Sequence, residues 1–524
     1  MELFAFILLT VLFAAVWALC IRGSVHIFQL NSYKPKVQGK WIYDHMLDII
    51  PKICWLVLIV PLVLKLRTLG MFISCAVCVV TICFNLPKKA KKPLVVTARV
   101  KRLFLTLGLI HALLILAAAL SPEYRDFFIM LYALAGLCEN YLVLAANRIN
   151  SPIEKAINNH YIRDAERMIR EMPELKVIGV TGSYGKTSVK FFTGRLLGAK
   201  YNTLITPESY NTTMGVVRTI REQLRPTHEF FICEMGARNM GDVREICDIV
   251  HPSAGIVTSI GPQHLESFGS IENVTKTKLE LVDSLPEGGK AFLNLDNEYI
   301  AARAADIPNV VGYRLAPRGA EPYEGVYCAY DVSVSARGSA FKLREPDGSV
   351  TELTTRLIGE HNVLNICGAV AVAREYGVEL RDIAARVRRL ESVPHRLELL
   401  GGGARAVIDD AYNSNPAGAK AALDALAQFD ALKILVTPGM VELGARQEEL
   451  NRAFGAQAAG VCDFVVLVGA RQTQPIAAGL RDAGFAQELV KTAETVQEAV
   501  ALADAFRPSE TRVILLENDL PDNY

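Results

Sequence analysis

The stretch that decides the fold is Val180-Thr181-Gly182-Ser183-Tyr184-Gly185-Lys186-Thr187-Ser188, which joins an apolar run from Lys176 to a helix-forming run through Phe192. A buried strand, a glycine-containing turn and a helix in this order direct backbone N–H groups and a helix N-terminus at phosphate. Lys186 would reach the outer phosphates of a nucleotide, while Thr187 or Ser188 would hold Mg²⁺. The strict G-x-x-x-x-G-K-[ST] pattern is not met, because its first glycine would fall on Val180. The shorter T-G-x-x-G-K-T-S form therefore predicts the nucleotide site.

Polar residues follow two further apolar runs. Glu234 ends the run that begins at Glu229, and His264 comes shortly after the run Ala254-Gly255-Ile256-Val257-Thr258. Because α/β folds place ligand and metal groups at the carboxyl ends of parallel strands, Glu234 is a candidate for such a site. His264 by itself would be a structural histidine that caps a loop. Lys276 and Lys278 lie on the helix predicted next, and by themselves they would be exposed helix charges.

The run from Thr181 to Lys190 resembles the ATP loop of the Mur ligase family, most closely in the member that adds D-alanyl-D-alanine to the cell-wall tripeptide. Further segments resemble that family in the same order, up to about residue 445. The resemblance implies an ATP-dependent, ADP-forming acid–amino-acid ligase of peptidoglycan synthesis. Such an enzyme activates a carboxylate as an acyl phosphate, which an amine then attacks. ATP and Mg²⁺ are the cofactors implied.

The same resemblance assigns site residues. Glu234 and His264 would hold Mg²⁺ with Thr187, and Lys278, in a K-x-E setting, would be carbamylated by CO₂ to give a further ligand; with Lys186 these residues form the expected catalytic centre. Nucleotide contacts are expected from Gly182, Ser183, Tyr184, Gly185, Lys186, Thr187, Ser188, Asn297, His361, Asn362, Asn365, Arg396 and Asp410. Substrate contacts are expected from Asn211, Thr212, Thr213, Tyr412, Asn413 and Asn415. Turn formation or helix capping is the alternative for the asparagines.

The first part of the chain differs in composition from the rest. Five apolar stretches before about residue 145 have the length that a bilayer requires: Leu3–Cys20, Leu47–Leu64, Leu69–Asn85, Leu103–Leu120 and Phe127–Leu144. Lysines and arginines gather between the first and second stretches and between the third and fourth, which predicts that these loops are cytoplasmic. The N-terminus would then lie outside a bacterial cytoplasmic membrane, with the catalytic domains in the cytosol. Lys65 and Arg67 leave an interfacial or re-entrant second and third segment as an alternative.

The fold class predicted is an α-helical membrane domain followed by α/β domains. We expect a membrane domain over 1–147, a helical connector over 148–175, a central P-loop-type ATP-binding domain over 176–393 and a C-terminal Rossmann-like domain over 394–524. Residues 308 to 356 alternate like strands and predict a small β excursion inside the central domain.

Charge and cysteine content argue against a nucleic-acid-binding protein and against a secreted disulfide scaffold. The net charge of +1 and the lack of a basic block in the soluble part argue against a nucleic-acid partner. Eleven cysteines without a paired framework suit a reducing compartment. Zinc-ribbon spacings are absent.

The substrates stay open because the family's usual UDP-gripping N-terminal domain has no evident counterpart here. The expected partners are membrane lipid, a UDP-linked or lipid-linked cell-wall precursor, and an amino acid or dipeptide. A poly-γ-glutamate synthetase-like or amidating ligase is the alternative enzyme. A nucleotide-regulated membrane transporter or scaffold is the alternative of another class, and Glu139 is the ionisable residue inside an apolar stretch that favours it.

Overall fold

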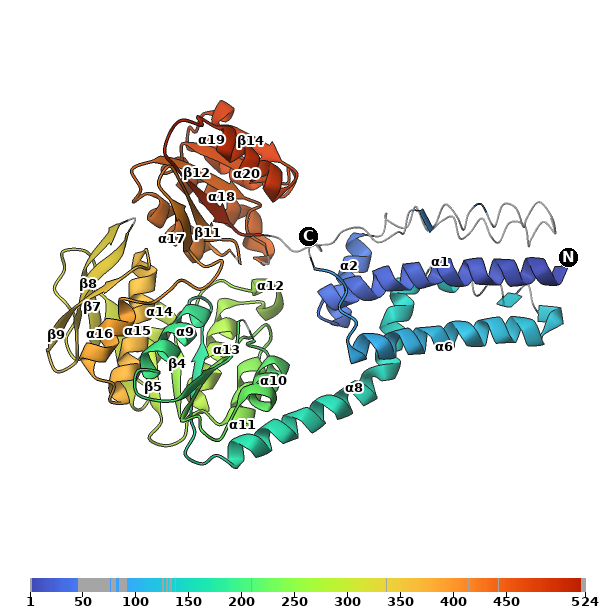
Figure 1. The fold of residues 1–524 in the computed structure, drawn as a ribbon, viewed down its shortest axis with the longest axis horizontal. Coiled ribbons are helices and arrows are strands. Elements are labelled where there is room, and N and C mark those ends of the chain that lie inside the picture. Colours follow the sequence, from blue (N-terminus) through green and yellow to red (C-terminus); the bar gives the residue numbers. More distant parts are fainter. Residues whose placement is uncertain are drawn as a thin grey trace. The chain divides into compact units, whose positions relative to one another are not determined.

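The structure is a computed structural model that describes residues 2–45, 76, 82–83, 92–124, 127–128, 131, 134–136, 138–208, 210–335, 337–412, 414–441 and 443–519. The chain forms two compact units, one of Met1–Asn159 with Leu520–Tyr524 and the other of His160–Asp519. The described part of the first unit is helical, and the second unit is α/β (Figure 1).

The first unit has an apolar helical core. Its described helices are α1 (Glu2–Leu30), α2 (Pro35–Asp44), α6 (Ala98–Leu120), the short η2 (Pro122–Tyr124) and the beginning of α8 (Glu139–Arg170). Phe28 of α1 and Leu107 of α6 are fully buried in one cluster. An ion pair of 2.6 Å between Arg102 and Glu154 links α6 to α8.

One helix in the described part of the chain is long and apolar enough to cross a bilayer. It covers Ala98–Ala117 with a mean hydropathy of 1.9, and Ala14–Leu30 is a shorter apolar helix. The predicted segment Leu47–Leu64 lies outside the described residues, as does Leu69–Asn85 except for three positions. The five-span arrangement therefore stays a prediction.

The middle domain is organised around one nine-stranded sheet of order β2-β3-β1-β4-β5-β6-β7-β8-β9. Strands β2 to β7 are parallel, whereas β7, β8 and β9 pair antiparallel. The strands are β1 (Lys176–Thr181), β2 (Thr203–Ile205), β3 (Phe230–Glu234), β4 (Ala254–Val257), β5 (Lys290–Asn294), β6 (Val310–Leu315), β7 (Tyr327–Ser335), β8 (Gly338–Arg344) and β9 (Val350–Thr355). The last four occupy the stretch where a β excursion was predicted.

Both faces of the parallel part are covered, which explains why its strands are apolar throughout. In β3, Phe230 and Ile232 face one core, while Phe231 and Cys233 face the other. The helices are α9 (Lys186–Leu197), α10 (Thr213–Gln223), α11 (Asp242–Val250), α12 (Leu265–Phe268), α13 (Ile271–Asp283), α14 (Glu298–Ala304), α15 (Glu360–Glu375) and α16 (Leu380–Val387). The central sheet thus holds β1 between two cores, and the phosphate loop follows its carboxyl end.

The C-terminal domain is a second α/β layer structure with the strand order β10-β11-β15-β12-β13-β14. Among the described strands of this sheet, β10 is antiparallel to β11 and the other pairs are parallel. Its strands are β10 (Glu398–Gly402), β11 (Arg405–Asp410), β12 (Leu432–Thr437), β13 (Phe464–Val468), β14 (Val490–Ala493) and β15 (Arg512–Glu517); its helices are α17 (Pro416–Leu426), η3 (Gly444–Arg446), α18 (Gln447–Ala459), α19 (Gln474–Asp482), η4 (Gln487–Leu489) and α20 (Val496–Ala505). The predicted α/β class of both domains is confirmed.

Candidate nucleotide and metal site

Two glycines shape the turn that follows β1. Gly182 has φ +146°, and a Cβ there would lie 2.1 Å from the Thr258 hydroxyl oxygen. Gly185 has φ +79° and is the N-cap of α9, and a Cβ there would lie 2.7 Å from Asn365 Oδ1. Left-handed backbone and close neighbours require glycine at both positions. Asn365, a predicted nucleotide contact, therefore packs against this loop from α15.

The segment after β4 holds the loop in place. The Ser183 N–H donates to the Ser259 carbonyl at 2.7 Å, and the Tyr184 N–H donates to Ser259 Oγ at 2.9 Å. Ser183 Oγ donates to the Gly261 carbonyl at 3.1 Å. The Tyr184 ring lies against Gly261, and burial raises the pKa of its hydroxyl. Ser259 was not predicted as a site residue, although it directly follows an apolar run.

The Lys186 side chain, at the start of α9, folds back over the loop that precedes it. Its Nζ donates to the Gly182 carbonyl at 2.7 Å and the Ser183 carbonyl at 3.0 Å. Burial lowers the pKa of Lys186 to about 8, although the Glu234 charge opposes this shift; Arg396 adds to it. Arg396 of the C-terminal domain is therefore near enough to the loop to act on the Lys186 charge.

Glu234, at the end of β3, is fully buried beside α9. The Thr187 hydroxyl donates to its Oε1 at 3.1 Å, and Asn211 Nδ2 donates to the same oxygen at 3.0 Å. Lys190 Nζ lies 3.1 Å from Oε2 as an ion pair. Burial acts to raise the Glu234 pKa, but the Lys190 and Lys186 charges and the Asn211 hydrogen bond outweigh it and lower the pKa. The carboxylate is thus anionic.

Two of these contacts extend the sequence predictions. Asn211 was expected to contact substrate, and the structure directs its amide at Glu234. Lys190 was not predicted as a site residue, yet its side chain is fully buried. Thr187 and Lys190 are three positions apart on α9 and share one face, so spacing could have indicated that both meet Glu234. Ser188 is half-buried on the same helix.

Lys278 differs from its neighbour Lys276 in burial. Lys276 is exposed on α13, whereas Lys278 is 1% exposed. Burial and the Lys186 charge lower the pKa of Lys278 well below its usual value, and Asp242, Glu280 and Glu234 act in the opposite direction. Glu280 accepts hydrogen bonds from the Gly241 and Arg244 N–H groups, so it caps α11.

Glu234 and Thr187 fit a magnesium ion in their chemistry. Mg²⁺ prefers oxygen ligands, including carboxylates and hydroxyls, and these two oxygens are already adjacent. His264 is half-buried at the N-cap of α12 with φ +53°. Its role as a ligand stays a prediction.

Several predicted nucleotide and substrate contacts have capping roles. The Asn297 side chain caps α14, Thr212 caps α10 and Asn415 caps α17. Asn362 donates to the Ile358 carbonyl at 2.9 Å. Capping is the alternative that was left open for the asparagines, and Thr212 caps a helix as well. The ligand contacts expected of these residues stay predictions.

The other residues predicted to contact nucleotide or substrate form a hydrogen bond, are buried, or lie beside a charged side chain. Thr213 Oγ1 donates to Glu245 at 2.8 Å. Burial lowers the pKa of His361, in the first turn of α15, to about 4. Tyr412 is 47% exposed, and the Arg396 guanidinium lies 4.3 Å from its ring centroid. Asn413 lies outside the described residues.

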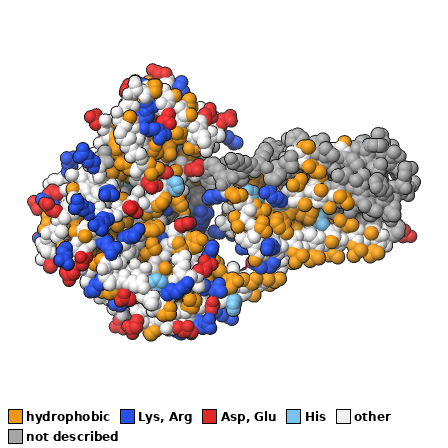
Figure 2. Space-filling model, in the orientation of Figure 1, with side chains coloured by type: hydrophobic (Ala, Val, Ile, Leu, Met, Phe, Trp, Pro, Cys, Tyr) orange, Lys and Arg blue, Asp and Glu red, His pale blue; other side chains and the backbone are white. Residues whose placement is uncertain are grey.

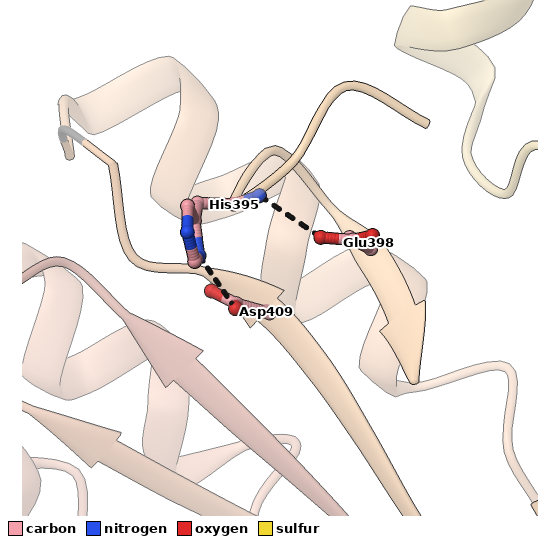
Figure 3. A group of neighbouring side chains, drawn as sticks. All are labelled: His395, Glu398 and Asp409. Carbon is pink, nitrogen blue, oxygen red and sulfur yellow. Dashed lines mark hydrogen bonds and ion pairs between the residues drawn. The ribbon is translucent and has the colours of Figure 1, made fainter. Parts of the chain in front are cut away.

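Several hydrogen bonds hold the backbone around Arg396, among them one from the Leu397 N–H to Asp410 Oδ1 at 3.0 Å. His395 Nδ1 pairs with Asp409 Oδ2 at 2.8 Å, and the His395 N–H donates to Glu398 Oε2 at 3.1 Å (Figure 3). His395 and Leu397 have φ values of +60° and +45°. Positive φ is costly for such residues, so these bonds offset the cost and position Arg396.

Gly185→Ala is expected to weaken ADP binding by about tenfold, since a Cβ would displace Asn365 and disturb the turn. The left-handed backbone adds a cost of about 1–2 kcal/mol in folding free energy. Gly288→Ala is the matched control, because Gly288 has φ +80° with no atom within 4 Å of the added Cβ. Calorimetric titration with ADP and thermal unfolding measure the two effects. Equal ADP affinity in both variants would contradict the assigned loop role.

The fold and this site define a P-loop-type nucleotide-binding protein with a second, Rossmann-like domain. Residues 180–373 match the Mur ligase middle domain, and residues 395–516 match the Mur ligase glutamate ligase domain. The chain belongs to the Mur ligase family.

Similar proteins agree with this assignment. The UDP-N-acetylmuramoyl-tripeptide–D-alanyl-D-alanine ligase of Escherichia coli K12 is 34% identical over 304 residues, covering 57% of this chain and 66% of that one. The Bacillus subtilis 168 ligase of the same name is 30% identical over 284 residues, covering 54% and 60%. The chain thus spans less than two thirds of the length of these relatives.

Solved structures share the fold. A crystal structure of MurF from Acinetobacter baumannii has a TM-score of 0.61 at 26% identity, covering 69% of this chain and 77% of that one. A MurF ligase from Thermotoga maritima, in complex with ADP, has a TM-score of 0.60 at 23% identity, covering 69% and 80%.

Proposed function

We propose that this protein is an ATP-dependent, ADP-forming ligase that joins a carboxylate to an amine in peptidoglycan precursor synthesis. The observation that supports this best is Glu234, which is held against Thr187 at 3.1 Å beside the phosphate loop. The relatives' names make a UDP-linked muramoyl tripeptide and D-alanyl-D-alanine the first candidate substrates. A lipid-linked precursor or a related amine is the second candidate.

The residues of the loop suit phosphoryl transfer to a carboxylate. The loop N–H groups and Lys186 would hold the β- and γ-phosphates. The carboxylate oxygen forms a bond to the γ-phosphorus, while the bond between the γ-phosphorus and the β-phosphate oxygen breaks and ADP leaves. The amine then attacks the carbonyl carbon, the C–N bond forms, and phosphate leaves. Bound Mg²⁺, held by Glu234 and Thr187, would neutralise phosphate charge.

Lys278 suits carbamylation. A buried lysine with a lowered pKa exposes a neutral amine to CO₂. The nitrogen of the neutral amine forms a bond to the CO₂ carbon and releases one proton, so a neutral amine becomes an anionic oxygen ligand. We propose this modification as the source of a further metal ligand. A rate that does not change when bicarbonate and CO₂ are removed would count against it.

The test of the ligase is ADP release by the purified full chain. A UDP-linked and a lipid-linked muramoyl tripeptide are each supplied with D-alanyl-D-alanine, D-alanine, glutamate or ammonia in turn, with bicarbonate present. Amine-dependent ADP release and a product of matching mass are expected with one of them. The same preparation without the acceptor gives the background. The absence of amine-dependent ADP release with every pair would reject the function.

We also propose that the first unit anchors the protein in the bacterial cytoplasmic membrane, with the catalytic domains in the cytosol. Hydrophobic side chains gather over this unit (Figure 2). Five leucines at helical spacing on α6 are each more than half exposed: Leu105, Leu109, Leu113, Leu116 and Leu120. Lipid would cover such a stripe. Flotation of the full chain with liposomes tests the anchor, and recovery of the chain apart from lipid would contradict it.

A further inference from the structure

Positive charge gathers at one end of the described helices of the first unit. Residues 22–44, which include the end of α1 and all of α2, and residues 92–102, which lead into α6, hold eight cationic side chains against one carboxylate, Asp44. The eight are Arg22, Lys34, Lys36, Lys40, Lys92, Arg99, Lys101 and Arg102. We call these two ranges the basic end. Glu154 of α8 pairs with Arg102, and the basic end stays strongly positive after that pair.

The two ranges of the basic end lie side by side, although they are far apart in the sequence. The Gln29 side chain of α1 exchanges two hydrogen bonds of 2.9 Å with the backbone of Val95. The Arg99 guanidinium lies 4.1 Å from the centroid of the Tyr33 ring. These contacts bring both sets of cations to one surface, so their charges act together on a partner.

Helix α2 directs its lysines outward. Gln38 and Ile42, four positions apart, are buried on one face. Lys36 and Lys40, also four positions apart, are exposed on another. Gln38 accepts a hydrogen bond of 2.8 Å from Asn31 Nδ2, which holds the helix against the turn after α1. A helix with one packed face and one exposed cationic face is typical of segments that lie along a bilayer surface.

Large apolar side chains are exposed among these cations. They are Val37 and Tyr43 of α2 and Val95 and Val96 before α6, and Tyr43 is 74% exposed. The backbone of a nucleic acid would pair with the lysines and leave the valines in water. The interface of a bilayer accepts both kinds of side chain, because phosphate lies next to hydrocarbon there. The mixture therefore favours lipid over nucleic acid.

The order of side chains along α6 matches the layers of a bilayer. Arg99, Lys101 and Arg102 lie at its beginning, and from Leu103 to its end the helix has no lysine, arginine, aspartate or glutamate. The exposed leucine stripe begins at Leu105. Charge therefore gives way to exposed hydrocarbon within one turn, about 5 Å along the helix axis. The basic end would lie at the level of the headgroups when the leucines contact acyl chains.

We propose that the basic end binds the headgroups of anionic phospholipids. This inference rests on the proposed membrane anchor and names the lipid class that the charged end of the anchor recognises. Lysine and arginine donate hydrogen bonds to the phosphate oxygens, while the valines and Tyr43 contact the region between the phosphates and the acyl chains. Each cation near an anionic leaflet strengthens binding by about fivefold. The predicted cytoplasmic location of these loops agrees, since the cytoplasmic leaflet is the anionic one.

The test is hydrogen exchange of the full chain in nanodiscs, followed by mass spectrometry. One set of discs contains phosphatidylcholine alone, and the other contains an equal mixture with phosphatidylglycerol. Peptides from α2 should exchange at least about fivefold more slowly in the anionic discs, and high salt should remove the difference because it screens exposed charges. Lys36→Gln with Lys40→Gln should lose the difference as well. Lys276→Gln with Lys491→Gln, which removes two exposed lysines elsewhere in the chain, is the matched control and should keep it.

The outcomes separate lipid binding by the basic end from the anchor. Equal exchange of α2 in both kinds of disc would overturn the lipid binding and leave the anchor. A chain that leaves phosphatidylcholine discs but stays with anionic discs would reject the anchor and leave the lipid binding. Slower exchange of α2 with double-stranded DNA, and not with anionic discs, would overturn the lipid binding in favour of a nucleic-acid partner. If the double variant alters the exchange of α1 in phosphatidylcholine discs, Lys101→Gln provides the same comparison.

Discussion

Glu234→Ala is expected to destabilise the middle domain by about 3–5 kcal/mol, because it leaves the Lys190 ammonium buried without its counter-charge. Both side chains are about 1% exposed or less. The Thr187 hydroxyl and the Asn211 amide lose their acceptor at the same time. Hydrogen exchange of peptides from β1 and β3, followed by mass spectrometry, measures the loss because it reports this domain separately.

Two further variants separate charge from packing. Glu222→Ala breaks an exposed pair with Arg218 on α10 and should leave the exchange of β3 unchanged. Glu234→Gln combined with Lys190→Met removes both charges and should recover much of the stability. Equal loss in the double variant and in Glu234→Ala would show that packing rather than the unpaired charge sets the cost.

The same pair predicts a pH dependence. The pKa of Glu234 lies below its usual 4.5 in the folded protein, so its stabilising contribution is complete above about pH 4.5 and is lost as the pH falls through the folded value. The stability difference between wild type and Glu234→Gln should therefore shrink on acidification. A difference that grows toward low pH would mean that the carboxyl is protonated in the native state.

The local pattern predicted the phosphate loop because every part of it is close in the chain. The apolar strand, the two glycines and the helix after Lys186 lie within a short segment, and the structure has each of them where expected. Glu234 was found in the same way, since a carboxylate that ends an apolar strand indicates the carboxyl edge of a parallel sheet.

Contacts between distant segments could not be predicted in this way. Glu517 lies beside Asp410 because β15 inserts between β11 and β12. The sequences of the two segments do not predict this strand order. Lys278 and Lys276 look alike in sequence, and only the packing of α13 buries one of them. Asn297, Thr212 and Asn415 cap helices, and the ligand contacts that the resemblance assigned to them stay predictions.

Lys186→Met should lower ADP release by about 10³-fold, since it removes the cation that faces charge developing on the transferred phosphoryl group. The side chain is held over the loop by the Gly182 and Ser183 carbonyls, so its ammonium is already positioned. Methionine keeps a similar length and apolar stem. The fold should survive, because the variant removes a charge whose pKa burial has already lowered to about 8.

The measurement is the rate of amine-dependent ADP release at saturating substrates, with Lys276→Met as the control. Lys276 lies exposed on α13 of the same domain, and its loss should change the rate by less than twofold. Lys186→Arg distinguishes charge from geometry, because the guanidinium is charged but planar and larger than an ammonium. If arginine restores most of the rate, charge alone is required. If both variants keep the wild-type rate, Lys186 does not contact the nucleotide, and the phosphate loop needs another ligand.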